Sequence, residues 1–304
     1  MGSLLFVYNP HSGIQTISRH LTKIVDLYTS AGFDVTVHPT QAPGDCKNTV
    51  MRLADSVERV IVAGGDGTHN EAVSGLIECG CSLPYGYIPC GSTNDFSHSL
   101  GIPVQIMRAA KNAICGEPFA YDIGRMNDRF FTYVAGFGAF TEVTYSTPQQ
   151  TKNTLGYVAY LITGAASLPN IVPYHVRFES PVRSGEGDYV LGLVTNTLQV
   201  GGMKNLLPHD ISLDDGLFEV LLVKNPRNAI ELNKILVSAV KHDFSADCFE
   251  YFKTPSITVT SDKPLAWTLD GENGGAHNVT EIRCMQRALR IVVDRPKPRA
   301  IPIR

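Results

Sequence analysis

The chain has 304 residues, of which 43% are hydrophobic and 18% charged, so it can form two domains with proper cores. A formal net charge of −3 gives no general attraction to nucleic acid, and seven cysteines, an odd number, favour reduced thiols over a disulfide framework. No apolar run is long enough to span a membrane, so we expect a soluble cytoplasmic protein whose membrane contact is peripheral.

Strand and helix patterns alternate over the first 120 residues. Short apolar runs predict strands at 4–8, 34–38, 59–63 and 86–89. Apolar positions at helical spacing predict helices at 14–30, 45–57, 68–79 and 104–114. This alternation predicts an α/β domain over residues 1–122, with a parallel sheet that binds its ligand beyond the carboxyl ends of the strands.

The texture changes after residue 122, where strand-like runs follow one another. They lie at 130–135, 175–179, 189–195, 218–223, 256–259, 265–269, 279–284 and 289–293, and helical patterns interrupt them at 155–167 and 229–240. Successive strands with tight turns predict a mainly antiparallel β-sandwich or flattened barrel over residues 123–294. The last 24 residues are basic and could touch an anionic membrane surface, although a solvated terminus is the favoured interpretation. Whether residues 295–304 pack back on the first domain stays open.

Three glycine-containing turns each follow an expected strand and open a helix. They are Asn9-Pro10-His11-Ser12-Gly13, Gly64-Gly65-Asp66-Gly67-Thr68 and Gly91-Ser92-Thr93-Asn94-Asp95. Glycine lets the backbone approach a ligand closely, and the helix behind each turn offers N–H groups and a positive dipole end. We therefore predict a phosphate-binding rim. For the first and third turns taken alone, a simple strand–helix connection is the better interpretation.

Asp66 decides the chemistry of the middle turn, because a carboxylate beside phosphates repels them unless a cation lies between. One helix N-terminus stabilises an anion by about 0.3–1 kcal/mol, and ~2 kcal/mol when partly buried, which is too little for a polyphosphate. The chain has no G-x-x-x-x-G-K-[ST] loop to supply a lysine. We therefore predict a divalent metal held by Asp66. Asp95 and Asp122 either join this network or serve as a helix cap and a junction hydrogen bonder.

A second pair of carboxylates lies in Asp270-Gly271-Glu272, which ends the strand expected at 265–269. Residues two apart point to the same side of extended chain, so Asp270 and Glu272 could together remove a hydroxyl proton and share a metal's field. Phosphoryl transfer depends on positioning and charge neutralisation more than on a strong base, so an ionised Glu272 would suffice. The open alternative is a solvated hairpin tip.

These motifs resemble the catalytic domain of the diacylglycerol kinase family. Gly64 to Glu71 matches the signature G-G-D-G-T-x-N-E, and the likeness spans nearly the whole chain in order. It includes Asn9-Pro10-x-Ser12-Gly13, Gly91 to Phe96, Tyr121-Asp122-Ile123-Gly124, Leu213-Asp214-Asp215-Gly216 and Leu269-Asp270-Gly271-Glu272. The most similar members are the soluble diacylglycerol kinases of Gram-positive bacteria. The resemblance implies a nucleotide-binding domain of the phosphofructokinase/NAD kinase type and a lipid-substrate domain, with ATP and Mg²⁺ used to convert diacylglycerol to phosphatidic acid.

The resemblance also implies roles for particular residues. Nucleotide-contacting positions would be Asn9, Pro10, His11, Ser12, Gly13, Thr40, Gly64, Gly65, Asp66, Gly67, Thr68, His69, Asn70, Glu71, Ser92, Asp95 and Asp122. Glu272 would be the catalytic base, with Asp66 and Asp270 as further catalytic carboxylates. A structural magnesium would bind the side chain of Asp215 and the main-chain carbonyls of Ser212 and Leu217. The apolar helix at 155–167 would be core or line a groove for lipid tails.

Several alternatives stay open. The acceptor could be another lipid alcohol, namely a sphingoid base, undecaprenol or phosphatidylglycerol. NAD kinases share the G-G-D-G-T turn, although Asn70-Glu71 and Asp270-Gly271-Glu272 count against a soluble nucleotide acceptor. The third alternative is a lipid-binding protein that has lost catalysis. The expected partners are a lipid surface and no nucleic acid, and a homodimer remains open.

Overall fold

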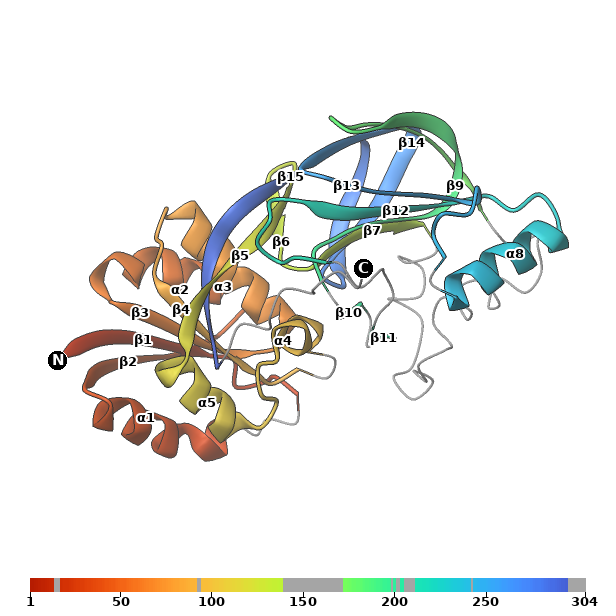
Figure 1. Ribbon diagram of the computed structural model, residues 1–304. Coiled ribbons are helices and arrows are strands. Elements are labelled where there is room, and N and C mark those ends of the chain that lie inside the picture. The colour runs from red at the N-terminus through yellow and green to blue at the C-terminus, as the bar shows by residue number, and fades with distance from the viewer. Residues whose placement is uncertain are drawn as a thin grey trace. The chain divides into compact units, whose positions relative to one another are not determined.

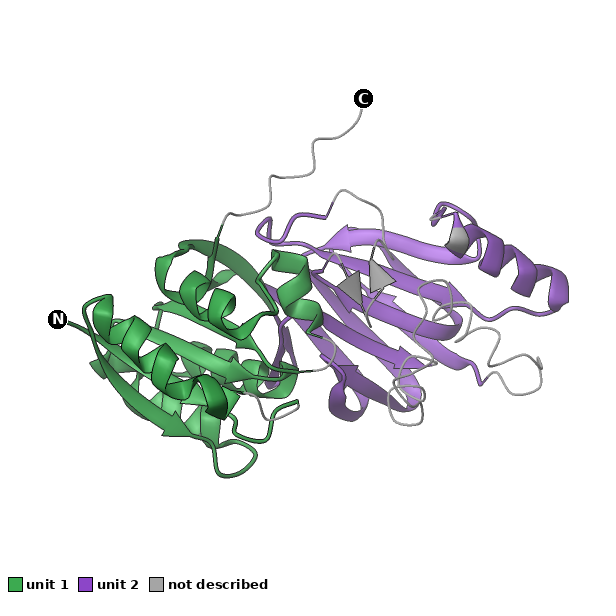
Figure 2. Cartoon of the chain, turned by 90° about the horizontal axis from the view of Figure 1, so that it is seen from below, with its two compact units in different colours: residues 1–123, 286–301 green, residues 124–285, 302–304 purple. Residues whose placement is uncertain are grey.

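The computed structural model describes residues 1–13, 17–91, 94–138, 172–197, 199–200, 203–204, 211–241 and 243–294. The chain divides into two compact units (Figure 2). Among the described residues, unit 1 comprises 1–123 and 286–294, and unit 2 comprises 124–285. Ser92, the helix expected at 155–167 and the segment 295–304 lie outside the described residues.

The sheet of unit 1 is built from β1 (Gly2–Tyr8), β2 (Phe33–Pro39), β3 (Arg59–Gly64) and β4 (Pro84–Pro89) in the order β2–β1–β3–β4. The pairings are parallel, with Leu4 of β1 opposite both Val35 and Arg59. Parallel strands place their carboxyl ends at one edge of the sheet. The turns that follow β1, β3 and β4 therefore meet at that edge.

Helices cover both faces of this sheet (Figure 1). They are α1 (Leu21–Ser30), α2 (Asp45–Leu53), α3 (Asp66–Glu78), α4 (Asp95–Leu100) and α5 (Ile106–Cys115), with short 3-10 turns η1 (Ile17–His20) and η2 (Ala54–Ser56). On one face, Ile24 and Tyr28 of α1 and the alanines of α5 pack on Phe6 and Ile61 of the sheet. The small alanines allow close approach, which is why a glycine stands at position 86: a Cβ there would lie 2.6 Å from that of Ala113.

Unit 2 consists mainly of antiparallel strands. They are β6 (Arg129–Phe131), β7 (Val134–Gly138), β8 (Tyr174–Glu179), β9 (Ser184–Thr195), β12 (Phe218–Lys224), β13 (Phe249–Thr254), β14 (Ser256–Leu269) and the first part of β15 (Glu272–Val293). The order is β13–β12–β9–β7–β14–β15, and β8 pairs with both β9 and β14. A small pair, β10 (Gln199–Val200) and β11 (Met203–Lys204), stands apart, and α8 (Ala229–Val240) connects β12 to β13.

The core of unit 2 is aromatic and aliphatic, with Phe137, Phe178, Phe218 and Trp267 all at most 1% exposed. Their strands alternate inward and outward residues, as in β8, where Val176 and Phe178 are buried and their neighbours are not. The antiparallel domain was predicted from the succession of strand-like runs with tight turns, and its strands are antiparallel. Strand β13 was not predicted, and β14 and β15 are each one strand where two were expected. In β14 a register shift between Thr260 and Leu265 bridges the polar stretch that suggested a break.

The domain boundary differs from the predicted one at its second end. Residues 286–294 belong to unit 1, whereas the sequence placed them in the second domain. The reason is that β15 ends beside β4, with Arg290 and Ile291 in parallel register with Pro84 and Tyr85. Likewise β5 (Glu117–Met126), which was not predicted, contains the boundary between Ile123 and Gly124.

Candidate active site

The middle turn of unit 1 joins β3 directly to α3. Gly65 is the N-cap with extended backbone, α3 begins at Asp66, and no side chain caps the helix. The first intrahelical bond runs from the N–H of His69 to the carbonyl of Gly65 at 3.0 Å. A side chain at position 64 could not fit, because a Cβ there would lie 2.5 Å from the Cβ of Thr68. The first-turn N–H groups of α3, which have no place in the helical ladder, therefore form a surface suited to an anion.

The first turn is bonded to the middle turn. Asn9 donates its backbone N–H to the Ala63 carbonyl at 2.8 Å, and its Nδ2 donates to the Thr68 hydroxyl at 3.2 Å. The Ser12 hydroxyl accepts the N–H of Gly65, also at 3.2 Å. The structure thus brings together Asn9, Ser12, Gly65 and Thr68, all predicted from the sequence. Pro10 and His11 complete the turn, in which the His11 N–H donates to Oδ1 of Asn9.

The third turn lies against both of the others. Cys90 donates its N–H to the Gly64 carbonyl at 2.8 Å, and a Cβ on Gly91 would come within 3.1 Å of the Gly65 Cα. Gly13 has a φ of +55°, and a Cβ there would lie 2.2 Å from the Cys90 carbonyl oxygen. Asn94, also left-handed, closes the turn through two hydrogen bonds with Gly91. The three turns therefore form one continuous rim, made largely of backbone.

The three predicted aspartates of unit 1 have different surroundings. Asp66 is partly exposed at the first position of α3. Its charge, together with the larger effect of burial, raises the pKa of Tyr87 well above its usual value, and the Tyr87 hydroxyl donates to the Gly64 carbonyl at 3.0 Å. Asp95 is 2% exposed at the first position of α4. Asp122 is fully buried and accepts the backbone N–H of Arg287 at 2.6 Å, holding that residue at a φ of 54°.

Other predicted nucleotide contacts are used inside the protein. Glu71 accepts the N–H of Gly44 at 2.7 Å, so it fixes the loop before α2. Thr40 is 8% exposed, and its N–H donates to the carbonyl of Tyr8 at the end of β1. The Oδ1 of Asn70 accepts the Ser74 hydroxyl at 3.4 Å. These contacts join α3 to the loop before α2, and the residue after β2 to the end of β1.

His69 lies in the core of unit 1. It is 0% exposed, its Nδ1 is 2.8 Å from the Tyr85 hydroxyl, and its ring centroid is 4.0 Å from that of Phe96. Burial lowers the pKa of His69 to about 3, so the ring is neutral at physiological pH. A ligand on the rim therefore cannot reach this imidazole, although the sequence counted it among the nucleotide contacts.

In unit 2, the hairpin turn between β14 and β15 carries Asp270 and Glu272. Asp270 and Gly271 have φ values of 50° and 86°, the conformation of the two-residue turn that joins antiparallel strands and favours Asp-Gly. The Asp270 carboxylate is 5% exposed and accepts four hydrogen bonds of 2.6–3.1 Å, from the N–H groups of Thr132, Tyr133 and Val134 and from the Thr132 hydroxyl. Asp270 is thus the anchor of the turn.

Glu272, by contrast, is exposed at the first position of β15. The sequence placed Asp270 and Glu272 on one side as a cooperating pair, and the structure gives them separate environments. The difference arises because the turn residues are left-handed, so the two-residue alternation of extended chain does not apply. The backbone N–H groups of 132–134 that hold Asp270 were not foreseen, since nothing in a sequence of Thr-Tyr-Val marks its amides as anion-binding.

The predicted metal turn lies before β12. Asp215 is exposed and its Oδ1 accepts the Leu217 N–H at 3.1 Å, while the Ser212 hydroxyl donates to Asp214. Nearby, Glu219 is 1% exposed, and one of its oxygens lies 3.4 Å from Lys253 Nζ. Burial raises the pKa of Glu219 to about 8, the Lys253 charge opposes this rise, and Asp215 adds to it. The described residues contain no group of three His, Cys, Asp or Glu arranged for a metal ion. Carboxylate and carbonyl oxygens such as those of this turn are nevertheless the donors that Mg²⁺ takes.

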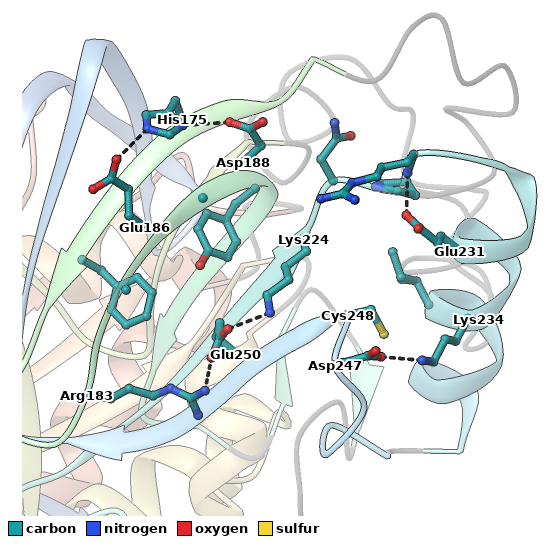
Figure 3. Close-up of a pocket in the computed structure, with 18 of the residues that line it drawn as sticks. His175, Arg183, Glu186, Asp188, Lys224, Glu231, Lys234, Asp247, Cys248 and Glu250 are labelled. Carbon is teal, nitrogen blue, oxygen red and sulfur yellow. Dashed lines mark hydrogen bonds and ion pairs between the residues drawn. The ribbon is translucent and has the colours of Figure 1, made fainter.

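A cavity of about 750 Å³ lies in unit 2, lined by residues of β8, β9, α8 and the start of β13 (Figure 3). Several of its charged side chains form ion pairs. Glu250 contacts Arg183 at 2.6 Å and Lys224 at 2.8 Å, and Lys234 pairs with Asp247. His175 lies between Glu186 and Asp188, whose hydrogen bonds raise its pKa. Much of the charge around this cavity is therefore used in contacts within unit 2.

The fold and the rim define a class of protein. Its first domain is an α/β domain with a glycine-rich rim at the carboxyl ends of the parallel strands, and its second is an antiparallel domain with an exposed carboxylate beside a hairpin turn. A profile of the diacylglycerol kinase catalytic domain matches residues 3–126. Diacylglycerol kinase of Bacillus subtilis (strain 168) is 36% identical over 272 residues, covering 88% of this chain and 89% of the relative. Diacylglycerol kinase of Staphylococcus carnosus (strain TM300) is 36% identical over 275 residues, covering 88% of each.

A crystal structure from Bacillus anthracis str. Sterne, of a protein assigned as a diacylglycerol kinase, is similar to this chain with a TM-score of 0.82 and 26% identity. The match covers 99% of this chain and 97% of that one. The chain belongs to the diacylglycerol kinase family, and it is therefore a lipid kinase that uses ATP. Within the described part of the chain, every helix is too short or too polar to cross a bilayer.

Proposed function

We propose that the protein transfers the γ-phosphoryl group of ATP to the hydroxyl of diacylglycerol, giving phosphatidic acid, with Mg²⁺ as the required cation. The observation that carries this proposal is Asp66, a partly exposed carboxylate at the N-terminus of α3 in a rim without lysine or arginine. A surface of amide N–H groups with one partly exposed carboxylate, Asp66, and one buried carboxylate, Asp95, suits a phosphate chain that arrives with its own cation. Relatives that are 36% identical to this chain are named diacylglycerol kinases.

The rim binds and orients the nucleotide in this proposal. Backbone N–H groups of the α3 first turn face the phosphates, and Asn9 and Ser12 hold the neighbouring loop in place through Thr68 and Gly65. Positioning of this kind supplies much of the rate in phosphoryl transfer, whose transition state is loose. Tyr87 supports Gly64 from below and stays protonated, because burial and the Asp66 charge keep its pKa high.

The donors present fit Mg²⁺ at two places. Asp66 would hold the nucleotide-associated ion, and Asp215 with the carbonyls of Ser212 and Leu217 would hold a structural one. When bound, the cation offsets the negative charge of the phosphates and of the developing transition state. Asp95 and Asp122 add negative charge to unit 1. Asp122 also accepts the backbone N–H of Arg287.

Glu272 is the proposed general base. Its side chain is exposed and stands on a turn whose other carboxylate is bound to the backbone. An exposed carboxylate can accept the proton of the attacking hydroxyl. Because the acceptor is a lipid, we also propose that the protein works in the cytoplasm at a membrane surface, through peripheral contact.

The test is a turnover assay with labelled ATP and mixed micelles containing diacylglycerol, a sphingoid base, undecaprenol or phosphatidylglycerol, with NAD as a soluble acceptor. We expect diacylglycerol to be phosphorylated and the reaction to stop when EDTA removes Mg²⁺. Asp66→Asn and Glu272→Gln should each lower kcat by on the order of 10³-fold or more.

Matched controls are Asp26→Asn on α1 and Glu117→Gln on β5, both exposed carboxylates outside the rim and the hairpin turn. These variants should keep wild-type turnover. Preferred labelling of NAD or of another lipid would replace the acceptor in this proposal. Near wild-type turnover in Glu272→Gln would remove Glu272 from the mechanism.

A further inference from the structure

We propose that Arg129 is a positioning residue, which fixes the backbone on the far side of Glu272 and so sets where the Glu272 carboxylate points. This inference rests on the proposed function, in which Glu272 is the base. Arg129 begins β6, opposite Met126 of β5. Its Nη1 donates to the carbonyl oxygen of Asn273 at 2.5 Å, across 144 residues of sequence.

The hairpin turn is held on both sides by one short segment, residues 129–134. Before Glu272, the N–H groups of 132–134 bind the Asp270 carboxylate, and the Tyr133 hydroxyl donates to the Asp270 carbonyl at 3.1 Å. After Glu272, Arg129 holds the Asn273 carbonyl. Glu272 is thus bracketed by two anchors that come from the same stretch of chain.

The second anchor matters because the turn is rich in glycine. Gly271 and Gly275 have φ values of 86° and 88°, and Gly274 stands between Asn273 and Gly275. Glycine gives the backbone the widest conformational range, so a segment of this composition is poorly restrained by itself. The Asn273 side chain restrains only its own loop, by accepting the Gly275 N–H at 2.8 Å. The strand ladder pairs Glu272, Asn273 and Gly275 with β14, with a register shift between Trp267 and Thr268. Among the described contacts, the Arg129 hydrogen bond adds a tie from a further strand, β6.

An arginine suits this role better than a lysine. Its guanidinium is planar and stays charged, and a hydrogen bond from a charged donor to a carbonyl is stronger than a neutral one. Displacing a reacting group by about 1 Å can cost on the order of 100-fold in rate. Loss of the Arg129 contact should therefore act on kcat through Glu272, and not on nucleotide binding.

The experiment compares Arg129→Ala and Arg129→Lys with Arg125→Ala in the full-length protein. Arg125 is an exposed arginine of the adjacent strand whose Nε donates to the Asn127 carbonyl, so it is a matched control that does not touch the turn. We expect Arg129→Ala to lower kcat by on the order of 10- to 100-fold with the KM for ATP unchanged, and Arg129→Lys to recover part of that loss. Arg125→Ala should behave as wild type. Amide exchange at 271–275 should accelerate in Arg129→Ala and not in Arg125→Ala.

A double-mutant cycle separates positioning from a general structural effect. In a Glu272→Asp background the carboxylate is already displaced, so adding Arg129→Ala should cost less than about threefold in kcat. The same loss in both backgrounds, or unchanged kcat in Arg129→Ala, overturns the inference. If instead Glu272→Gln keeps wild-type turnover, the proposed base fails, which is a different result from an inert Arg129 beside an essential Glu272.

Discussion

The Asp66 turn of unit 1 and the Asp270–Glu272 turn of unit 2 are built from the same residue types and use them in opposite ways. In unit 1, the Cys90 N–H donates to the Gly64 carbonyl, the Ser12 hydroxyl accepts the Gly65 N–H, and Asp66 is partly exposed. In unit 2, the aspartate itself holds the backbone, and the glutamate beyond it is left exposed.

This difference gives a way to assign acidic residues near glycines. A carboxylate that accepts several backbone N–H groups is part of the scaffold, because moving it would leave those donors buried and unsatisfied. A carboxylate on the same turn without that load is available for chemistry. By this criterion Asp270 supports the structure, and Glu272 is the candidate for function on this turn.

The strongest test of the comparison is Asp270→Ala. The change leaves the N–H groups of Thr132, Tyr133 and Val134 without their acceptor, and we expect a loss of about 3–5 kcal/mol in the free energy of unfolding. Urea unfolding followed by circular dichroism measures it. Glu272→Ala, two residues away and exposed, should change the same quantity by less than about 0.5 kcal/mol. Equal effects in the two variants would end the distinction between scaffold and chemistry.

A smaller loss of stability is expected when a side chain is placed at position 64, where β3 and α3 lie close together. Gly64→Ala introduces a Cβ that would lie 2.5 Å from the Cβ of Thr68, so α3 must shift away from β3. We expect a loss of about 1–3 kcal/mol in the free energy of unfolding together with weaker ATP binding. Gly80→Ala is a useful comparison, because its Cβ would meet no atom within 4 Å although its φ of +70° is strained. Unimpaired ATP binding in Gly64→Ala would show that the close approach is unimportant for the rim.

The third test concerns the His69 ring, whose protonation affects stability only at acid pH and has no effect near pH 7. Its pKa of about 3 in the folded protein is below the ordinary value of 6.5, so only the unfolded chain takes up this proton as the pH falls from 6.5 towards 3. His69 should therefore lower stability in that window, by at most about 1.4 kcal/mol per pH unit, and have no pH-dependent effect above it.

The measurement is the difference in unfolding free energy between wild type and His69→Gln at several pH values. We expect this difference to be constant above about pH 6.5 and to move in favour of the variant as the pH falls. A difference that stays flat down to pH 4 would mean that the imidazole is protonated in the folded protein, and hence that it lies in a more polar place than the structure gives.

The sequence predicted those features that depend on local pattern. Alternation of strands and helices located β1 to β4, and the glycines of the three turns located the rim. Contacts between distant segments could not be predicted, because the periodicity of apolar residues does not indicate which segments pair. The burial of His69 under Phe96, the binding of Asp270 by residues 132–134 and the return of β15 to β4 are all of this kind. The bond between the Glu71 side chain and the Gly44 N–H was missed for the same reason.

In the proposed function, the hydrogen bonds that join the three turns of unit 1 also affect the free energy of ATP binding. Asn9–Thr68, Ser12–Gly65 and Cys90–Gly64 are formed within the chain itself, so the loops acquire their arrangement when the domain folds. A ligand that meets an already ordered surface loses less of its binding free energy to ordering that surface. If ATP binds at this rim as proposed, the residues joined by these hydrogen bonds are ordered before the nucleotide arrives, and ordering them does not reduce its affinity.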